Sequence, residues 1–241
     1  MKLLYRIYQL FFALPLGLLA TLLTAIITSV GCLLGSAHFW GYYPAMLWSR
    51  FICRILLLPI RIKGNKHVLH NRSYVFVANH QGSMDIFLIY GYLGRNFKWM
   101  MKQSLRRIPF VGYACQKARH IFVDNSKASK IKQTIEQGRE TLQDGTSLVV
   151  FPEGARTFTG KMRNFRRGAF VLAHEIGLPI VPLTINGSFK ALPRTKGFFF
   201  VERTPLTLTI HEPIDTTQYS TETLPSLIER THTVIASALE E

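Results

Sequence analysis

An uncharged, apolar stretch runs from Ile7 to Leu34, and it limits what this chain can fold into. As a helix, these 28 residues would extend about 42 Å, which exceeds the roughly 30 Å hydrocarbon core of a bilayer. Pro15 is placed to kink such a helix. A cleaved signal peptide is the alternative, because Gly35-Ser36-Ala37 resembles a cleavage site, but the apolar region is about twice the usual length. A second apolar block at residues 51–60 follows, and we therefore favour a retained membrane anchor.

Basic charge is concentrated in the same part of the chain. Residues 1–123 contain 15 Lys and Arg and a single acid, Asp85, whereas the remaining residues carry 14 basic and 13 acidic side chains. The net charge is +15, yet 48% of the residues are hydrophobic, a combination that suits an anionic membrane surface. Nucleic acid is the rival partner, but the sequence has no zinc spacing, basic-region heptad or RNP-like aromatic motif. We expect membrane lipids and no nucleic acid.

The length of 241 residues suits one compact domain, which we place at residues 61–241, behind an anchoring helical segment at residues 1–60. Cations follow the apolar stretch and favour a domain on the cytoplasmic side of the inner membrane: Arg50, Arg54, Arg61, Lys63 and Lys66. Aromatic residues near the end of the anchor fit an interfacial belt, with core packing as the alternative: Trp40, Tyr42, Tyr43 and Trp48. The three cysteines show no metal or disulfide spacing, so we expect no metal and a reducing compartment.

Beyond the anchor, strand and helix patterns alternate. The predicted strands are residues 73–78, 147–151, 179–185 and 206–210. The predicted helices begin at a Ser83 cap, at an Asn125 or Ser126 cap and near residues 167 and 224; Gly145 and Gly177 end two of them. This alternation predicts an α/β fold with a central, mostly parallel sheet flanked by helices, plus the N-terminal hydrophobic anchor.

His80 and Asp85 are the first candidates for chemistry. The strand pattern ends just before His80, and functional groups of such sheets gather beyond the carboxyl ends of strands. A histidine held by a carboxylate can act as a general base. Five residues apart within one helix they could not meet, so the pair requires His80 on the turn and Asp85 in the first helical turn. The plain alternative is a capping Asp beside an incidental His.

A second block, Phe151 to Thr157, places Glu153, Gly154 and Arg156 just after another strand. A glycine turn with a guanidinium can face an anion through both backbone N–H groups and charge. A structural ion pair between Glu153 and Arg156 is the alternative. Further cations could contact the same anion, although charged residues are more often simply solvated: Lys102, Arg166 and Arg167.

These blocks together resemble the glycerolipid acyltransferase family. Its Asn-His-x4-Asp block is matched by residues 79–85, its Phe-Pro-Glu-Gly-x-Arg block by residues 151–156 and its Val-Pro block by residues 181–182. Lys102 and Ile108-Pro-Phe-Val-Gly112 match a further stretch. Where the family often has Gly-x-x-Phe-Ile-Asp-Arg, this chain reads Arg119 to Asn125, so the final arginine is missing and Arg119 or Lys102 would substitute.

The resemblance implies an acyltransferase domain that moves an acyl chain from a thioester, acyl-CoA or acyl-carrier protein, to the sn-2 hydroxyl of lysophosphatidic acid, giving phosphatidic acid in phospholipid biosynthesis. It implies no cofactor beyond the thioester co-substrate. His80 and Asp85 would be catalytic, Arg156, Lys102, Glu153 and Gly154 would bind substrate, and backbone N–H groups near Gly82 would hold the oxyanion. The alternatives are acylation of another lysolipid and a noncatalytic, basic membrane-binding protein.

Overall fold

The computed structural model describes residues 1–69, 71–123, 130–194 and 200–240. Its N-terminus is one nearly continuous helical rod, formed by α1 (Lys2–Tyr8), the π-helical turn Gln9–Ala13 and α2 (Leu14–Leu34). The wide turn lies just before Pro15, which lacks an N–H and cannot complete the usual helical hydrogen bond. This rod is the helix, among the described residues, that is long and apolar enough to cross a membrane.

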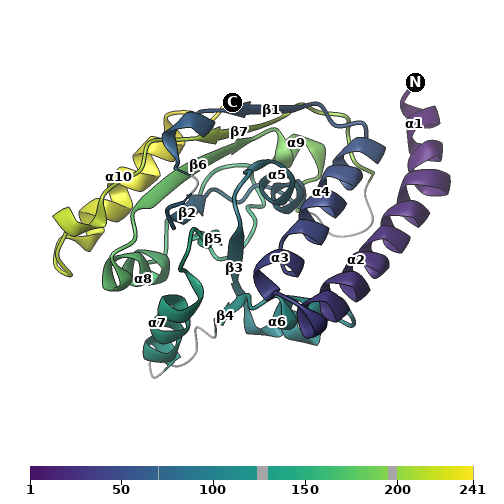
Figure 1. Cartoon of the computed structure of the whole chain (residues 1–241). Coiled ribbons are helices and arrows are strands. Elements are labelled where there is room, and N and C mark those ends of the chain that lie inside the picture. Colours follow the sequence, from purple (N-terminus) through teal and green to yellow (C-terminus); the bar gives the residue numbers. More distant parts are fainter. Residues whose placement is uncertain (70, 124–129, 195–199, 241) are drawn as a thin grey trace.

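Two shorter helices, α3 (Ala37–Trp40) and α4 (Tyr43–Ile55), return along the rod in the opposite direction (Figure 1). The Tyr8 hydroxyl donates to the Ile55 carbonyl at 2.9 Å, and Trp48 Nε1 donates to Thr21 Oγ1 at 3.0 Å. Gln9 also exchanges two 2.8 Å hydrogen bonds with the backbone of Val201. The apolar rod is therefore joined to the rest of the fold by specific polar contacts.

Seven strands form one sheet in the order β1-β7-β6-β2-β5-β3-β4. Their bounds are Ile60–Lys63 (β1), Val75–Ala78 (β2), Phe97–Lys102 (β3), Ile121–Val123 (β4), Ser147–Val150 (β5), Ile180–Asn186 (β6) and Leu206–Ile210 (β7). Only the β6–β7 pairing is antiparallel among these adjacent pairs, so β1 and β7 oppose the other five strands. The expected mostly parallel sheet is confirmed.

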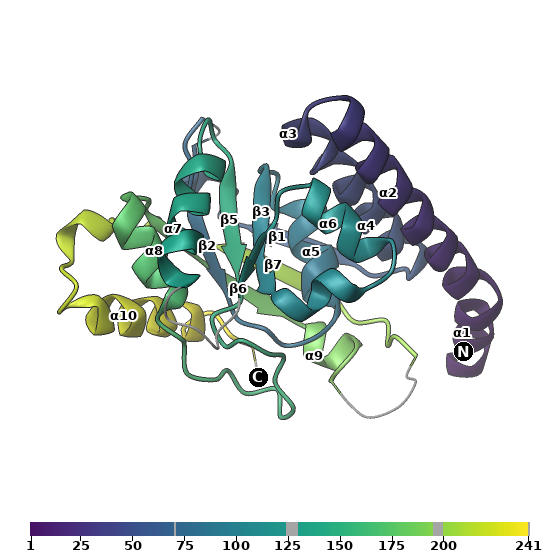
Figure 2. The same cartoon turned by 90° about the horizontal axis from the view of Figure 1, so that it is seen from below.

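Helices cover both faces of this sheet (Figure 2). One face packs against α5 (Met84–Tyr92), behind which lies α4, while α6 (Val111–Lys117) lies against α2. The other face carries α7 (Lys130–Thr141), α8 (Gly168–Ile176) and α10 (Leu224–Ala236). The remaining elements are short: α9 (Ser188–Ala191) and the 3₁₀ turns Asn65–His67, Gln103–Arg107 and Thr216–Gln218.

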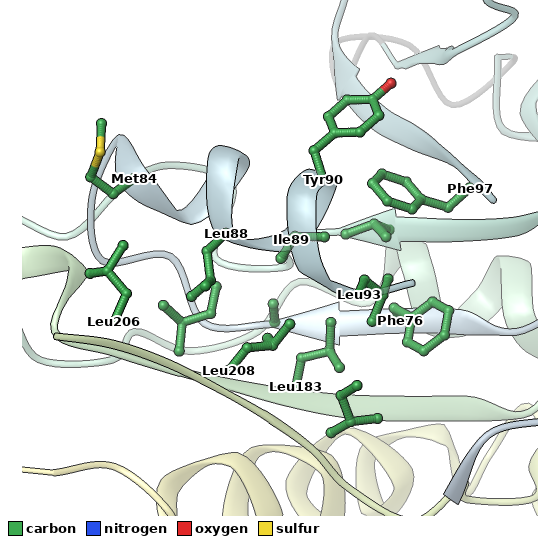
Figure 3. Close-up of a cluster of buried hydrophobic side chains, with 14 of the residues drawn as sticks. Phe76, Met84, Leu88, Ile89, Tyr90, Leu93, Phe97, Leu183, Leu206 and Leu208 are labelled. Atoms are coloured by element: carbon green, nitrogen blue, oxygen red, sulfur yellow. The ribbon is translucent and has the colours of Figure 1, made fainter. Parts of the chain in front are cut away.

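The larger core lies between the sheet and α5. Leu88 and Ile89 of α5 are fully buried against strand residues such as Phe76 and Leu183 (Figure 3). Tyr42 belongs to this core with 3% exposure, and its ring meets Phe97 edge-on at 5.6 Å. The interfacial-belt prediction is therefore wrong for Tyr42, whereas core packing, the alternative, is correct.

Most predicted elements are confirmed, including the end of α8 at Gly177, whose φ of 69° is left-handed. Three strands, β1, β3 and β4, went unpredicted. Ser83 precedes α5 as expected, but its side chain makes no capping hydrogen bond. The predicted Asn125 or Ser126 cap lies outside the described residues. The boundary expected at residue 60 falls where β1 begins, and it remains a prediction.

Candidate active site

His80 and Asp85 meet across the turn between β2 and α5. His80 follows the last strand residue by two positions, and Asp85 lies in the first turn of α5. His80 Nδ1 is 2.8 Å from Asp85 Oδ2, and the same oxygen accepts the Gly82 N–H at 3.0 Å. Asp85 is fully buried, while 14% of the His80 side chain is exposed. The geometric condition set by the sequence is therefore met.

The turn between them depends on Gly82. A Cβ at this position would lie 2.7 Å from the Ser188 carbonyl oxygen and 2.8 Å from that of Leu192. Such contacts are too short for any side chain, so only glycine lets the turn pass under the loop after β6. Gly82 donates its own N–H to Asp85 in this structure, so this N–H is not available to an oxyanion.

Two buried side chains fix the His80 backbone. Asn79 bridges from the end of β2 to β6, because its amide donates to the Ile185 carbonyl and accepts from the Ile185 N–H. Glu153, 2% exposed, accepts the His80 N–H at 2.7 Å through Oε1 and the Arg163 N–H at 2.9 Å through Oε2. Burial raises the pKa of Glu153, and the two backbone N–H groups oppose that shift. The alternative for this block, an ion pair of Glu153 with Arg156, is not seen among the described residues.

Aromatic stacking orients the His80 ring. The ring lies 3.8 Å from that of Phe151 at an interplanar angle of 9°, and Phe151 stacks on Trp99 at 5.4 Å. His80 and Phe151 follow the carboxyl ends of β2 and β5, Trp99 lies within β3, and the three strands are neighbours in the sheet. A flat stack on one side and Asp85 at Nδ1 leave the ring little freedom to turn.

Arg156 comes to the same place from the loop after β5. Its guanidinium donates to the hydroxyl of Ser83, the residue before α5. Arg194 donates to the Arg156 carbonyl at 3.2 Å. The Arg156 guanidinium is thus held at Ser83, two residues before Asp85 in sequence.

Gly154 takes a left-handed conformation, with φ of 76°, and the Arg166 guanidinium packs against it. A Cβ at Gly154 would lie 2.9 Å from the central carbon of that guanidinium. Arg166 is therefore close to the Gly154 turn, whereas Arg167 is exposed at the start of α8. Lys102 is exposed at the carboxyl end of β3, on the same edge of the sheet as His80.

The prediction that Arg119 contacts the substrate phosphate requires a correction, because the structure places Arg119 at the opposite end of the strands from His80. It precedes β4, whose Ile121 pairs with Met100, so Arg119 lies level with Lys98 near the start of β3. The level of His80 is roughly 15 Å further along the strands. Arg119 cannot join Arg156 at one phosphate from there. Asn125, the other departure from the family pattern, lies outside the described residues.

Sequence reasoning assigned no role to Trp99 or Arg194, and it treated Asn79 only as part of a motif. All three act through contacts with residues far away in the chain, so no local sequence pattern predicts their roles. No group of three His, Cys, Asp or Glu side chains able to hold a metal ion occurs within the described ranges.

The arrangement supports proton transfer near an anion. With Nδ1–H directed at Asp85, the second ring nitrogen of His80 is free of its proton and can accept one. The Ser83 hydroxyl is engaged by Arg156, which argues against Ser83 as a nucleophile. The pair is therefore arranged to act on a group other than the Ser83 hydroxyl.

Comparison with known proteins gives the chemical class. Residues 59–186 match the sequence model of the Acyltransferase family. The 1-acyl-sn-glycerol-3-phosphate acyltransferase of Saccharomyces cerevisiae is 29% identical over 224 residues, covering 90% of this chain and 72% of that protein. The enzyme of the same name from Cocos nucifera is 29% identical over 194 residues, covering 80% of this chain but only 62% of that protein.

A solved structure shows the same architecture. The crystal structure of the 1-acyl-sn-glycerophosphate (LPA) acyltransferase PlsC from Thermotoga maritima matches with a TM-score of 0.65 and 25% identity. The match covers 92% of this chain and 94% of that one, and so it extends well beyond the sheet.

Proposed function

Because this chain belongs to the Acyltransferase family, we propose that it acylates the sn-2 hydroxyl of 1-acyl-sn-glycerol 3-phosphate, giving phosphatidic acid. The observation that carries the proposal is the 2.8 Å contact between His80 Nδ1 and Asp85 Oδ2, with the Arg156 guanidinium bonded to Ser83 close by. A base and a phosphate-binding cation are thus adjacent. The acyl donor is a thioester, either acyl-CoA or acyl-carrier protein.

The reaction needs one proton relay and no covalent enzyme intermediate. His80 takes the proton of the acceptor hydroxyl while the oxygen forms a bond to the thioester carbonyl carbon. Asp85 holds the ring in the required tautomer and stabilises the imidazolium. As the C–S bond breaks, the imidazolium returns the proton to the departing thiolate, so that ester and free thiol leave a neutral His80.

Arg156 binds the acceptor phosphate in this proposal, with Lys102 contributing positive charge from the end of β3. Gly154 supplies the turn that brings Arg156 and Arg166 to the site, and Glu153 holds the His80 backbone. Arg167 is an outer cation at the start of α8. Acceptors without a phosphate monoester, such as other lysolipids, form the alternative substrate class.

Membrane placement follows from the apolar rod. The helix at residues 2–34 is long and apolar enough to cross a membrane, and most of its apolar part is not buried in the protein. We place the protein in the inner membrane with its site on the cytoplasmic side, where Arg54, Arg61 and Lys66 face anionic lipid.

Thiol release from acyl-CoA with a panel of acceptors tests the proposal. His80→Ala is expected to abolish release, and His174→Ala on α8 is the matched control. Arg156→Ala is expected to weaken turnover of lysophosphatidic acid about 10–100-fold but to leave a phosphate-free acceptor nearly unchanged, because a charge-assisted contact is lost. Turnover unchanged in His80→Ala would overturn the mechanism. Preference for a phosphate-free acceptor would overturn the substrate assignment.

A further inference from the structure

Four large apolar side chains project from the chain after β3, three from the connection to α6 and one, Tyr113, from the first turn of α6. Exposure reaches 41% at Leu105, 44% at Ile108, 64% at Phe110 and 48% at Tyr113. They occur within nine residues, and we refer to these four as the apolar tip. Single exposed apolar residues are ordinary, but a cluster of this size on one turn indicates a surface that is covered in use.

The backbone holds Phe110 outward at a cost. Phe110 has φ of 57° and ψ of −54°, and the Val111 N–H bonds to the Pro109 carbonyl at 2.6 Å across it. A three-residue turn with positive φ is rare and strained. Gly112 secures it, because a Cβ there would lie 2.3 Å from the Arg106 carbonyl oxygen. The fold therefore fixes an exposed aromatic side chain in a conformation that a relaxed loop would avoid.

The apolar tip is continuous with the membrane helix. An apolar hollow of about 300 Å³ lies between α2 and α6, lined by Ala25, Ile26, Ser29, Val30, Phe110 and Tyr113. Both views place α6 beside α2 (Figures 1 and 2). Lipid that surrounds the outward side of α2 would therefore also reach the tip.

Cations flank the tip, and acids do not. Arg106 and Arg107 lie between Leu105 and Ile108, and Lys117 follows the tip with its ammonium 5.2 Å from the centre of the Tyr113 ring. No acidic residue occurs between residues 86 and 123. Apolar side chains ringed by Lys and Arg suit the boundary between acyl chains and anionic headgroups.

We propose that the apolar tip is a second membrane contact, which inserts into the interfacial layer of an anionic bilayer beside α2. Its position has a functional consequence. The segment begins at Lys102, at the carboxyl end of β3, the edge of the sheet that holds His80. Insertion of the tip brings this edge to the headgroup layer. The inference uses the membrane association proposed above but not the identity of the acceptor.

Fluorescence of the full chain in vesicles tests the insertion. Cys32, Cys53 and Cys115 are replaced by alanine, and a single environment-sensitive label is attached at Phe110→Cys or, as control, at Glu229→Cys on α10. In vesicles of phosphatidylcholine and phosphatidylglycerol, the label at position 110 should shift to the blue and be quenched by lipids brominated on their acyl chains. The label at position 229 should remain accessible to aqueous iodide.

A label at position 110 that stays open to iodide in vesicles would overturn the proposal. So would a blue shift in detergent that grows with protein concentration, since that indicates a second copy or another protein as the occupant. These readouts need no turnover, so a protein inactive on lysophosphatidic acid would sink the proposed function and leave this inference intact.

Activity in the unlabelled chain provides an independent measurement. Phe110→Ser should lower turnover of acceptor embedded in vesicles about tenfold, because a large apolar side chain no longer leaves water. Turnover of a short-chain acceptor in solution should not change. Leu69→Ser, at a position 60% exposed on the loop before β2, is the matched control and should change neither. Equal losses on both acceptors in Phe110→Ser would indicate folding damage and count against insertion.

Discussion

Replacing Asp85 by Asn separates orientation of His80 from the rest of the site. Asp85 Oδ2 accepts from His80 Nδ1 and from the Gly82 N–H, while Oδ1 is buried with no hydrogen-bond partner among the described residues. An Asn side chain has the same shape but only one acceptor oxygen. If that oxygen takes the Oδ2 position, its amide NH₂ is buried without an acceptor, which costs about 1–3 kcal/mol.

The other orientation of the Asn side chain, with its NH₂ in the Oδ2 position, is no more favourable. In this orientation the NH₂ faces both the Gly82 N–H and the His80 ring. The Gly82 N–H is then buried without an acceptor, which again costs about 1–3 kcal/mol. This orientation also forces Nδ1 of His80 to accept, which moves the ring proton to the nitrogen that must act as base. Both orientations lose the negative charge that stabilises the imidazolium, a charge-assisted bond worth about 1.5–3 kcal/mol.

The unsatisfied amide lowers the stability of the folded protein in the ground state and the transition state alike, so the fall in kcat comes from the lost charge and the wrong tautomer; we expect about 10²–10⁴-fold. KM for lysophosphatidic acid should change little, because Arg156 is untouched. Thiol release at saturating acyl-CoA measures kcat. Asp215→Asn is the matched control, since exposed Asp215 also accepts two hydrogen bonds through one oxygen, from the N–H and hydroxyl of Thr217. A fall of less than tenfold in a folded Asp85→Asn protein would refute the orienting role.

Three further predictions follow from other contacts. Gly82→Ala should lower both thermal stability and kcat, because its Cβ would clash with the Ser188 carbonyl under the catalytic turn; a normal melting temperature with full activity would contradict this. Burial lowers the pKa of Lys98 from 10.5 to about 8, so between pH 8 and 10.5 the unfolded chain binds more protons and stability should rise with pH by about 3 kcal/mol. In detergent, the melting temperature of Lys98→Met should lack that rise. Arg119→Ala should leave KM for lysophosphatidic acid unchanged, whereas Arg156→Ala raises it; equal effects in the same assay would contradict the placement of Arg119.

The sequence predicted the turn between His80 and Asp85 because the pattern that indicates it is local, although residues far along the chain hold it in place. A buried strand, a glycine and a helix start lie within a dozen residues, and the five-residue spacing of His80 and Asp85 admits only one arrangement in which they meet. The same holds for Gly177, where a left-handed residue ends α8. Local backbone geometry and side-chain period are properties that a short stretch carries by itself.

The unpredicted strands show the opposite case. β3 reads Phe-Lys-Trp-Met-Met-Lys, and its Lys98 is 3% exposed inside the fold, where it donates to the Ala37 carbonyl at 3.1 Å. A lysine in such a stretch normally indicates a solvated side. Here the hydrogen-bond acceptor is Ala37, the first residue of α3, some sixty residues earlier, so no pattern within β3 predicts that Lys98 is buried. The prediction that Tyr42 lies at the membrane interface is wrong for a similar reason, since its core partners lie on α5 and β3.

Arg119 shows how a structural requirement can look like a binding signal. It stands where the family pattern often has glycine, and in this chain its φ is 60°, a left-handed value that glycine adopts without strain. The glycine of that pattern is thus explained by the turn into β4 rather than by a nearby ligand. An arginine at this position keeps the turn and adds a cation beside Lys98, at the end of the sheet away from His80. The charge that matters for an acceptor phosphate must instead come from residues following the carboxyl ends of β5 and β3, and Arg156 and Lys102 are so placed.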